Sequence, residues 1–246
     1  MIKKFFEFRQ ENYEPIKSFH LHEELNSDIW IGEALDENIR EELVQIGKDY
    51  FDSIELDDEI LDIILTGSLC GYNYSKYSDF DVHIIIDYEK VNPDLKLVKK
   101  YLAYTKKLWS LQHNIYIKGY DIEVYCQDIN ETHVSNGQYS LLKNEWIKKP
   151  SKDNTIIDEK LINEKTELIM SIIDDIDKAY KNGEIYSELE PQLKIIWKKI
   201  SDNRKAGLEK EGELSIENLV FKLLRRNGYI QKLMDLKIKI YDDQFN

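Results

Sequence analysis

The sequence feature that most restricts the fold is a strongly alternating segment, Asp79-Phe80-Asp81-Val82-His83-Ile84-Ile85-Ile86. In a β-strand, residues two apart share a face, so Asp79 and Asp81 point to the same side. The apolar residues that point to the opposite side are Phe80, Val82, Ile84 and Ile86. The pattern therefore predicts a strand with one face in a hydrophobic core and a pair of carboxylates on the other.

Two carboxylates side by side on one strand face indicate a metal site. Like charges held this close repel each other and cost stability, and a divalent cation between them removes that cost. Magnesium prefers one or two carboxylates together with substrate phosphates. The alternative is a solvated strand face, since antiparallel sheets often expose one side to water. That alternative gives no reason for a phosphate-binding turn or a further carboxylate nearby.

A turn with phosphate-binding features precedes the alternating segment. The apolar run Ile63-Ile64-Leu65 breaks at Gly67-Ser68, and a spacer of ten residues separates this pair from Asp79. A glycine lets backbone N–H groups approach an anion closely, and a serine hydroxyl can donate to a phosphate oxygen. A phosphate-binding turn beside paired carboxylates predicts a nucleoside triphosphate bound with its magnesium.

This combination resembles the signature of the nucleotidyltransferase superfamily related to DNA polymerase beta. The resemblance implies that Gly67-Ser68 binds the triphosphate and that Asp79 and Asp81 bind metal. It also implies a third carboxylate on a later strand, between apolar neighbours. Glu123 fits that position in Gly119-Tyr120-Asp121-Ile122-Glu123-Val124-Tyr125, and Asp121, on the same face, is the alternative. The implied cofactor is Mg²⁺, as two ions, with Mn²⁺ as a substitute.

The spacer between the turn and the strand is expected to contribute to nucleotide binding. Within the site that the resemblance implies, Lys76 and Ser78 are candidate phosphate contacts. Tyrosine is frequent in the spacer, and two roles are open for these side chains. They could stack on a base, or they could cover the edge of the sheet. The tyrosines concerned are Tyr72, Tyr74 and Tyr77.

A narrower likeness is to predicted nucleotidyltransferases encoded by large tailed phages. It rests on the Ser-Asp-Phe-Asp motif and the tyrosine-rich spacer, and it extends through residues 130–133 and 204–208. It implies no known activity. It does imply a phage protein acting in the cytoplasm of a bacterial host.

The expected fold class is α+β, with a mixed β-sheet flanked by helices and followed by a C-terminal helical bundle. We expect a catalytic domain with an N-terminal arm over residues 1–150 and a helical domain over residues 151–246, because the segment 150–156 is polar and begins with proline. One helix is predicted after Asp36 as N-cap, and another at Asn92-Pro93. An apolar stripe on the second helix is expected to pack on the sheet, with its lysines in solvent. The stripe is Leu97, Tyr101, Tyr104, Leu108 and Leu111.

The predicted helical domain carries a local excess of positive charge. A helix capped by Ser215 is expected to end in Arg225 and Arg226. In the superfamily that the sequence resembles, a helical second domain lines the nucleotide cleft. Arg204, Lys205 and Arg225 are therefore candidates for holding the triphosphate tail, since the arginine fork suits phosphate oxygens. The alternative is a charge-balanced helix exterior.

The net charge and the composition disfavour two classes of partner, extended nucleic acids and membranes. Among 246 residues the formal net charge is -13, which disfavours an extended nucleic acid because such binding depends on a basic surface. A nucleotide delivered as its magnesium complex is compatible with that charge. The sequence has no apolar run of membrane-spanning length and no signal-peptide pattern at its start, so we expect no membrane partner and a cytoplasmic location. Cys70 and Cys126 are expected to be reduced thiols.

The predicted activity is transfer of a nucleoside monophosphate from a nucleoside triphosphate to a hydroxyl acceptor, with release of pyrophosphate. The acceptor is open: a nucleotide, a protein hydroxyl, an RNA end and a small molecule all supply one. The alternative from a different class is a non-catalytic nucleotide-binding sensor or decoy with the same fold.

Overall fold

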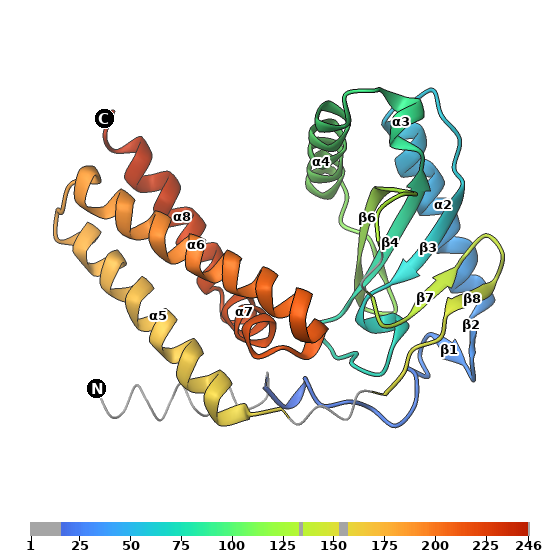
Figure 1. Cartoon of the computed structure of the whole chain (residues 1–246), viewed down its shortest axis with the longest axis horizontal. Helices are drawn as coiled ribbons and strands as arrows, with labels where there is room; N and C mark the ends of the chain where they lie inside the picture. Colours follow the sequence, from blue (N-terminus) through green and yellow to red (C-terminus); the bar gives the residue numbers. More distant parts are fainter. Residues whose placement is uncertain (1–15, 133–134, 153–156, 246) are drawn as a thin grey trace. The chain divides into compact units, whose positions relative to one another are not determined.

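The computed structural model describes residues 16–132, 135–152 and 157–245. The chain divides into two compact units, each described here by itself. One unit spans Leu21–Asp153 and contains the β-sheet (Figure 1). The other is helical, and its described parts are residues 16–20 and 157–245.

The first unit is built on a six-stranded sheet of mixed direction, in the order β5-β6-β4-β3-β7-β8. Strands β4 and β6 run parallel, and every other neighbouring pair is antiparallel. The strands are β3 (Asp62–Thr66), β4 (Asp79–Ile86), β5 (Tyr116–Ile117), β6 (Tyr120–Asp128), β7 (Gln138–Ser140) and β8 (Glu145–Lys148). A separate small hairpin joins β1 (Trp30–Ile31) to β2 (Ala34–Leu35). The predicted α+β class with a mixed sheet and a C-terminal helical group is confirmed.

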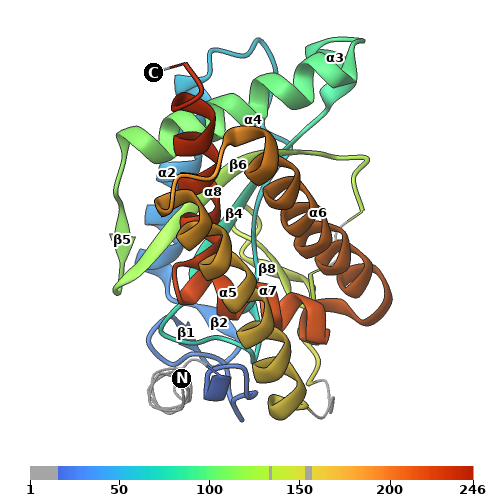
Figure 2. The ribbon, with the colours of Figure 1, turned by 90° about the vertical axis from the view of Figure 1, so that its left-hand side faces the viewer.

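Two helices cover the apolar face of the sheet. Helix α2 (Glu37–Ser53) begins at Asp36, whose carboxylate accepts the predicted capping hydrogen bonds from the next turn. Helix α4 (Leu95–Gln112) follows the short helix α3 (Tyr88–Val91) and leads into β5, as Figure 2 shows. Beneath these helices, the alternate apolar side chains of β4 are fully buried, which confirms the predicted two-faced strand. The carboxylates of β4 therefore lie on the opposite face.

Helix α4 begins two residues later than predicted. Its N-cap is Asp94, which accepts hydrogen bonds from the N–H groups of Lys96 and Leu97. Asn92 instead accepts from the N–H of Asp94. A carboxylate at the first turn also interacts favourably with the helix dipole, which explains why the aspartate displaces the predicted Asn92-Pro93 start.

The apolar stripe of α4 does not pack on the sheet, contrary to prediction. Its five members are between 41% and 76% exposed. The helix instead contacts the core through a neighbouring stripe that contains Val98, Leu102 and Trp109. Both stripes have helical spacing, so periodicity alone could not decide which one is buried.

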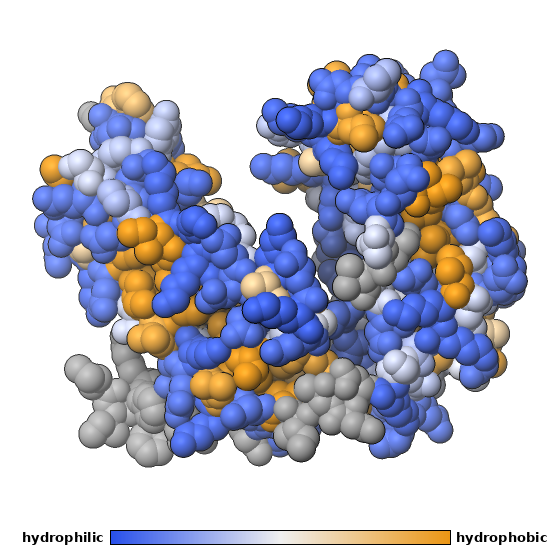
Figure 3. Space-filling view, viewed as in Figure 1, coloured by the Kyte–Doolittle hydropathy of each residue, from blue (hydrophilic) through white to orange (hydrophobic). Residues whose placement is uncertain are grey.

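In its described part, the second unit contains four α-helices of eleven residues or more. They are α5 (Glu159–Lys181), α6 (Tyr186–Glu211), α7 (Ile216–Arg226) and α8 (Tyr229–Asp242). Hydrophobic residues are visible between α5 and α6 in Figure 3. Ile16 and Phe19 are buried in the core of this unit, and Arg226 donates a hydrogen bond of 2.6 Å to the Ser18 hydroxyl. The described end of the N-terminal segment therefore belongs to the helical unit.

The junction of α6 and α7 depends on a glycine. Ser215 occupies the N-cap position of α7, as predicted, but its side chain makes no capping hydrogen bond. A Cβ atom added to Gly207 would lie 2.8 Å from the Ser215 hydroxyl oxygen, so the two helices could not approach as closely with a larger residue there. Within the described part of the chain, no helix combines the length and the apolar character that a bilayer span requires.

Candidate metal and nucleotide site

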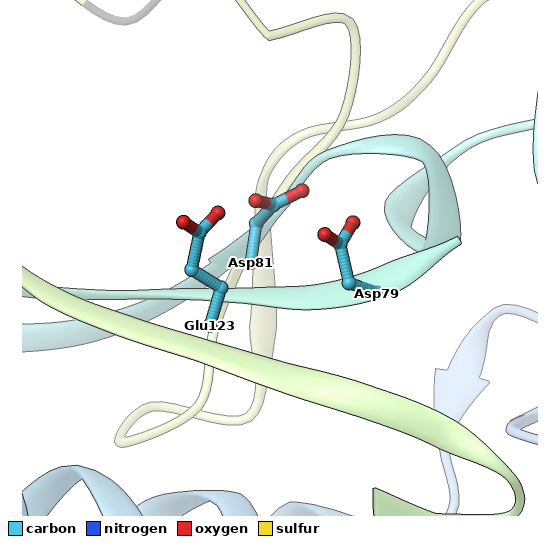
Figure 4. Close-up of side chains that lie close together, drawn as sticks. All are labelled: Asp79, Asp81 and Glu123. Atoms are coloured by element: carbon cyan, nitrogen blue, oxygen red, sulfur yellow. The ribbon is translucent and has the colours of Figure 1, made fainter. Parts of the chain in front are cut away.

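Three carboxylates converge on the polar face of the sheet. In the parallel register of β4 and β6, Asp81 lies opposite Glu123. One carboxylate oxygen each from Asp79, Asp81 and Glu123 lies within 4.8 Å of the others. Figure 4 shows the three side chains reaching to the same side of their strands. All three are partly exposed to solvent, so an ion or a substrate can approach them.

Asp121, the alternative third carboxylate, is not part of this group. It pairs with Asp79 in the register, but its side chain is exposed and accepts a hydrogen bond from the N–H of Ile122. It also lines a small pocket of about 70 Å³ together with Trp109 and His113. Of the two candidates for the third carboxylate, Glu123 lies beside Asp79 and Asp81, and Asp121 does not.

Gly67 lies directly against one of these carboxylates. It has a positive φ of 76°, and a Cβ atom at this position would lie 1.8 Å from Oδ2 of Asp81. Its N–H donates to the Ser135 hydroxyl at 3.3 Å, and that hydroxyl donates to the carbonyl of Gly137 at 2.9 Å. Only a residue without a side chain fits between β3 and Asp81 here.

The turn after Gly67 is joined to the far end of the spacer. Ser68 begins a short 3₁₀ turn, and its hydroxyl is 2.7 Å from the Ser78 hydroxyl. The Ser78 hydroxyl also accepts a hydrogen bond of 2.9 Å from the N–H of Ser75. Two of the predicted phosphate contacts therefore lie together beside Asp79. Lys76, a third, is exposed, with its ammonium 5.3 Å from the centre of the Tyr77 ring.

The spacer tyrosines contact their own unit. The Tyr74 ring stacks on His22 with 3.8 Å between ring centres, and His22 also hydrogen-bonds to the Tyr74 carbonyl. The Lys152 ammonium lies 5.2 Å from the centre of the Tyr72 ring. Tyr74 also packs against the hydrophobic core of this unit.

One lysine of α4 contacts the carboxylate group, although the sequence pattern predicted that it would lie in solvent. Lys106 of α4 forms a 2.7 Å ion pair with Glu123, and its ammonium lies 4.1 Å from the centre of the Tyr125 ring. Burial raises the pKa of Tyr125, and the negative charges of Asp81 and Glu123 raise it further. Lys106 lies four residues after Leu102, which is buried, so the two side chains share a face of α4. Nothing else in the sequence indicates that Lys106 faces the sheet.

His83 lies on the same face as the carboxylates but deeper. It is buried, with Nε2 3.1 Å from the Thr66 hydroxyl and Nδ1 hydrogen-bonded to Gln127. Its ring centre is 4.3 Å from that of Tyr125. Thr66 is the register partner of Asp81, so this buried polar group supports the strand pair that carries the carboxylates. Strand alternation puts His83 on the face of the carboxylates, whereas nothing in the sequence pattern pointed to Thr66 or Gln127 as its partners.

The segment after β6 follows the third-carboxylate strand, so His133, Ser135 and Tyr139 are candidates for the rim of the site, and the structure places Ser135 and Tyr139 differently. Ser135 reaches the Gly67 turn, as described above. Tyr139 does not: it is buried, packs edge-on against Trp30, and donates a hydrogen bond of 2.7 Å to Asn144. Its position in the core reflects the strand alternation of β7. His133, the third residue expected there, lies outside the described residues.

The predicted phosphate-binding cations of the C-terminal region lie in the helical unit. Arg204 donates to Asn218 at 3.1 Å and packs over the Phe221 ring at 4.0 Å. Burial lowers the pKa of Arg204, and the charge of Arg225 lowers it further. Lys205 is exposed and lies 3.9 Å from Glu209. Arg204 is therefore partly engaged in packing, whereas Arg225 is exposed at the end of α7.

The carboxylate group has the chemistry that a hard divalent cation requires. Each of its three residues offers a carboxylate oxygen, the ligand type that Mg²⁺ and Mn²⁺ favour, and the spacing allows one ion to contact all of them. The turn at Gly67 keeps a backbone N–H and serine hydroxyls beside these oxygens. Comparisons of the chain with protein-family models, with curated proteins and with solved structures gave no match.

Proposed function

We propose that this protein is a metal-dependent nucleotidyltransferase, which moves a nucleoside monophosphate from a nucleoside triphosphate to a hydroxyl acceptor. The observation that carries the proposal is the convergence of Asp79, Asp81 and Glu123 to within 4.8 Å beside the Gly67 turn. A solvated strand face does not account for an approach that only glycine permits. The resemblance implies a helix, then a strand, then the Gly-Ser turn, and α2, β3 and Gly67-Ser68 follow one another in that order.

The chain's own residues supply binding and proton transfer. Ser68, Ser78 and the backbone near Gly67 would bind the β- and γ-phosphates, with Lys76 reaching from the spacer. Asp79, Asp81 and Glu123 would hold the divalent ions, which neutralise charge on the phosphates and lower the pKa of the acceptor hydroxyl.

The reaction balances as an in-line displacement. The acceptor oxygen forms a bond to the α-phosphorus, the bond from that phosphorus to the bridging oxygen breaks, and pyrophosphate leaves. In this proposal Glu123 would take the proton of the acceptor hydroxyl. Most of the rate would come from positioning and charge neutralisation.

The substrate side of the proposal is a nucleoside triphosphate, with the acceptor a nucleotide, a protein hydroxyl, an RNA end or a small molecule. The net charge of -13 disfavours an extended nucleic acid as acceptor. The likeness to phage proteins favours a bacterial cytoplasm as the place of action.

The test is pyrophosphate release from each labelled nucleoside triphosphate, with Mg²⁺ or Mn²⁺ and a panel of acceptors. We expect turnover by the native chain, and loss of at least about a hundredfold when Asp79→Ala and Asp81→Ala remove positioning and charge neutralisation. Asp121→Ala is the matched control, because this residue is on the same sheet face but outside the carboxylate group. Equal loss in the control, or turnover that survives both site substitutions, would refute the proposal.

A second candidate, a non-catalytic nucleotide sensor, is favoured by one contact. The ion pair of Glu123 with Lys106 already neutralises the carboxylate that catalysis would use for proton transfer. A sensor would bind a nucleotide tightly in the presence of magnesium, and no acceptor in the panel would produce pyrophosphate. Equilibrium binding of each nucleotide, measured beside turnover, separates the two functions.

A further inference from the structure

Helix α4 presents an unusual apolar face to solvent. The exposed fractions are 73% for Tyr104, 55% for Leu108 and 76% for Leu111, and Leu97 and Tyr101 continue the same face. Tyr101 is held in place by a 2.6 Å hydrogen bond from its hydroxyl to the Ile54 carbonyl. Large apolar side chains gathered on one face of a rigid helix are typical of an interaction surface.

The spacing of this face is that of a coiled-coil seam. Successive members are four, three, four and three residues apart, from Leu97 to Leu111. That is the heptad repeat in which a and d positions meet a partner helix, with Tyr101 and Leu108 at a. We call these five residues the α4 seam. The core-facing stripe with Val98 and Leu102 occupies other heptad positions, so the seam residues are not part of the hydrophobic core.

The charges beside the seam have one sign. Helix α4 contains no aspartate or glutamate, and its lysines are Lys96, Lys99, Lys100, Lys106 and Lys107. Lys99 and Lys106 pair with acidic residues of the same unit. Lys100 and Lys107 occupy the g positions beside the seam, are exposed, and have no salt-bridge partner in the described part of the chain. In a protein of net charge -13, this helix is a basic exception.

We propose that the α4 seam is the docking surface for an acidic amphipathic helix of a partner protein. Leucine-type residues of that helix would pack between the seam residues, and its glutamates or aspartates would pair with Lys100 and Lys107. This inference does not depend on the proposed nucleotidyltransferase activity.

Two other occupants fit less well. In a dimer of this chain, two α4 helices whose charged residues are all lysines would meet. In an antiparallel pair the lysines at their g positions would face and repel each other. A lipid surface requires no heptad register, and the net charge of -13 opposes approach to an anionic bilayer. The narrow a/d spacing and the flanking lysines therefore favour a protein helix with acidic flanks.

The test uses a labelled synthetic helix with leucine at a and d and glutamate at e and g, added to the full chain at low salt. We expect saturable binding by fluorescence anisotropy. The double variant Lys100→Glu with Lys107→Glu should weaken binding about tenfold or more, and it should gain binding to the matching peptide with lysine at e and g. The control variant, Lys48→Glu with Lys96→Glu, changes the same charge at exposed positions off the seam and should bind as the native chain does.

A second variant tests the apolar part. Tyr104→Ser with Leu108→Ser should abolish peptide binding and leave the thermal midpoint unchanged, because both side chains are exposed. Absence of binding to the acidic peptide would overturn the proposal. So would equal binding of both peptides, seam-dependent dimerisation in sedimentation, or seam-dependent binding to vesicles with anionic lipid in place of the peptide.

Discussion

Gly67 and Asp81 contact each other at a distance that no other residue at position 67 would allow. The positive φ of 76° and the 1.8 Å between a virtual Cβ and the Asp81 oxygen are separate constraints that both require glycine. The backbone turn and the carboxylate are therefore positioned as one unit.

We expect Gly67→Ala to displace the Asp81 carboxylate and to weaken Mn²⁺ binding strongly, as measured by titration calorimetry. The clash and the unfavourable φ should together cost on the order of 1–3 kcal/mol of unfolding free energy. Gly119→Ala is the matched control, because Gly119 also has a positive φ, of 83°, but nothing lies within 4 Å of its virtual Cβ. If the two variants bind Mn²⁺ equally, the close contact has no role in the site.

In the proposed metal site, Lys106 would compete with the cation for Glu123, with which it forms a 2.7 Å ion pair. An ion pair of this exposure is worth up to about 1 kcal/mol, so Lys106→Met should raise Mn²⁺ affinity by up to about fivefold. Lys99 is on the same helix as Lys106 and forms a 3.5 Å ion pair with Glu131. Lys99→Met removes that pair and should leave the Mn²⁺ affinity unchanged. Weaker binding in Lys106→Met would instead mean that the lysine holds Glu123 in place for the ion.

At the scale of single elements, α4 has an inner and an outer apolar stripe with different energetic roles. Leu102→Ala removes a buried side chain and should lower the unfolding free energy by about 2–5 kcal/mol. Leu108→Ala removes an exposed one on the same helix and should change it by no more than about 0.5 kcal/mol. Urea denaturation of both variants measures the difference. A similar loss in Leu108→Ala would show that the seam is covered within the chain.

Strand β4 and the helix start at Asp36 were predictable because their signals are local: alternation for one, a capping side chain for the other. The third carboxylate was expected only because the family resemblance implies an acidic residue between apolar neighbours on a later strand, a position that Glu123 fits. Lys106 was not, because its role depends on how α4 is rotated on the sheet, and two stripes of equal spacing fit that helix. Thr66 and Gln127 were missed because the partners of a buried histidine come from strands far apart in sequence.

For the molecule as a whole, the lowered pKa of a paired carboxyl predicts how stability depends on pH. In the helical unit, hydrogen bonds from Lys181 and Lys232 lower the pKa of Asp177. A carboxyl whose folded pKa is below its ordinary value stabilises the fold above the unfolded pKa, and that contribution is lost as pH falls. We therefore expect the stability of the helical unit to drop as pH falls below 3.8, the ordinary aspartate value.

Asp177→Asn should remove part of that pH dependence, measured as the change in urea midpoint between pH 7 and pH 3. Asp175→Asn, at an exposed position that pairs only with Lys178 on the same helix, is the comparison. If the urea midpoint of Asp177→Asn changes between pH 7 and pH 3 as much as that of the native chain, other carboxyl groups cause the acid sensitivity.

The parallel pairing of β4 with β6 has a consequence for biosynthesis. Parallel neighbours cannot be joined by a tight hairpin, and here the connection passes through α3 and α4 before Glu123 is reached. A nascent chain that has emerged only as far as α4 carries Asp79 and Asp81 without the third carboxylate, Glu123. In the proposed metal site, the full set of three carboxylate ligands would therefore form only when β6 has left the ribosome and joined the sheet.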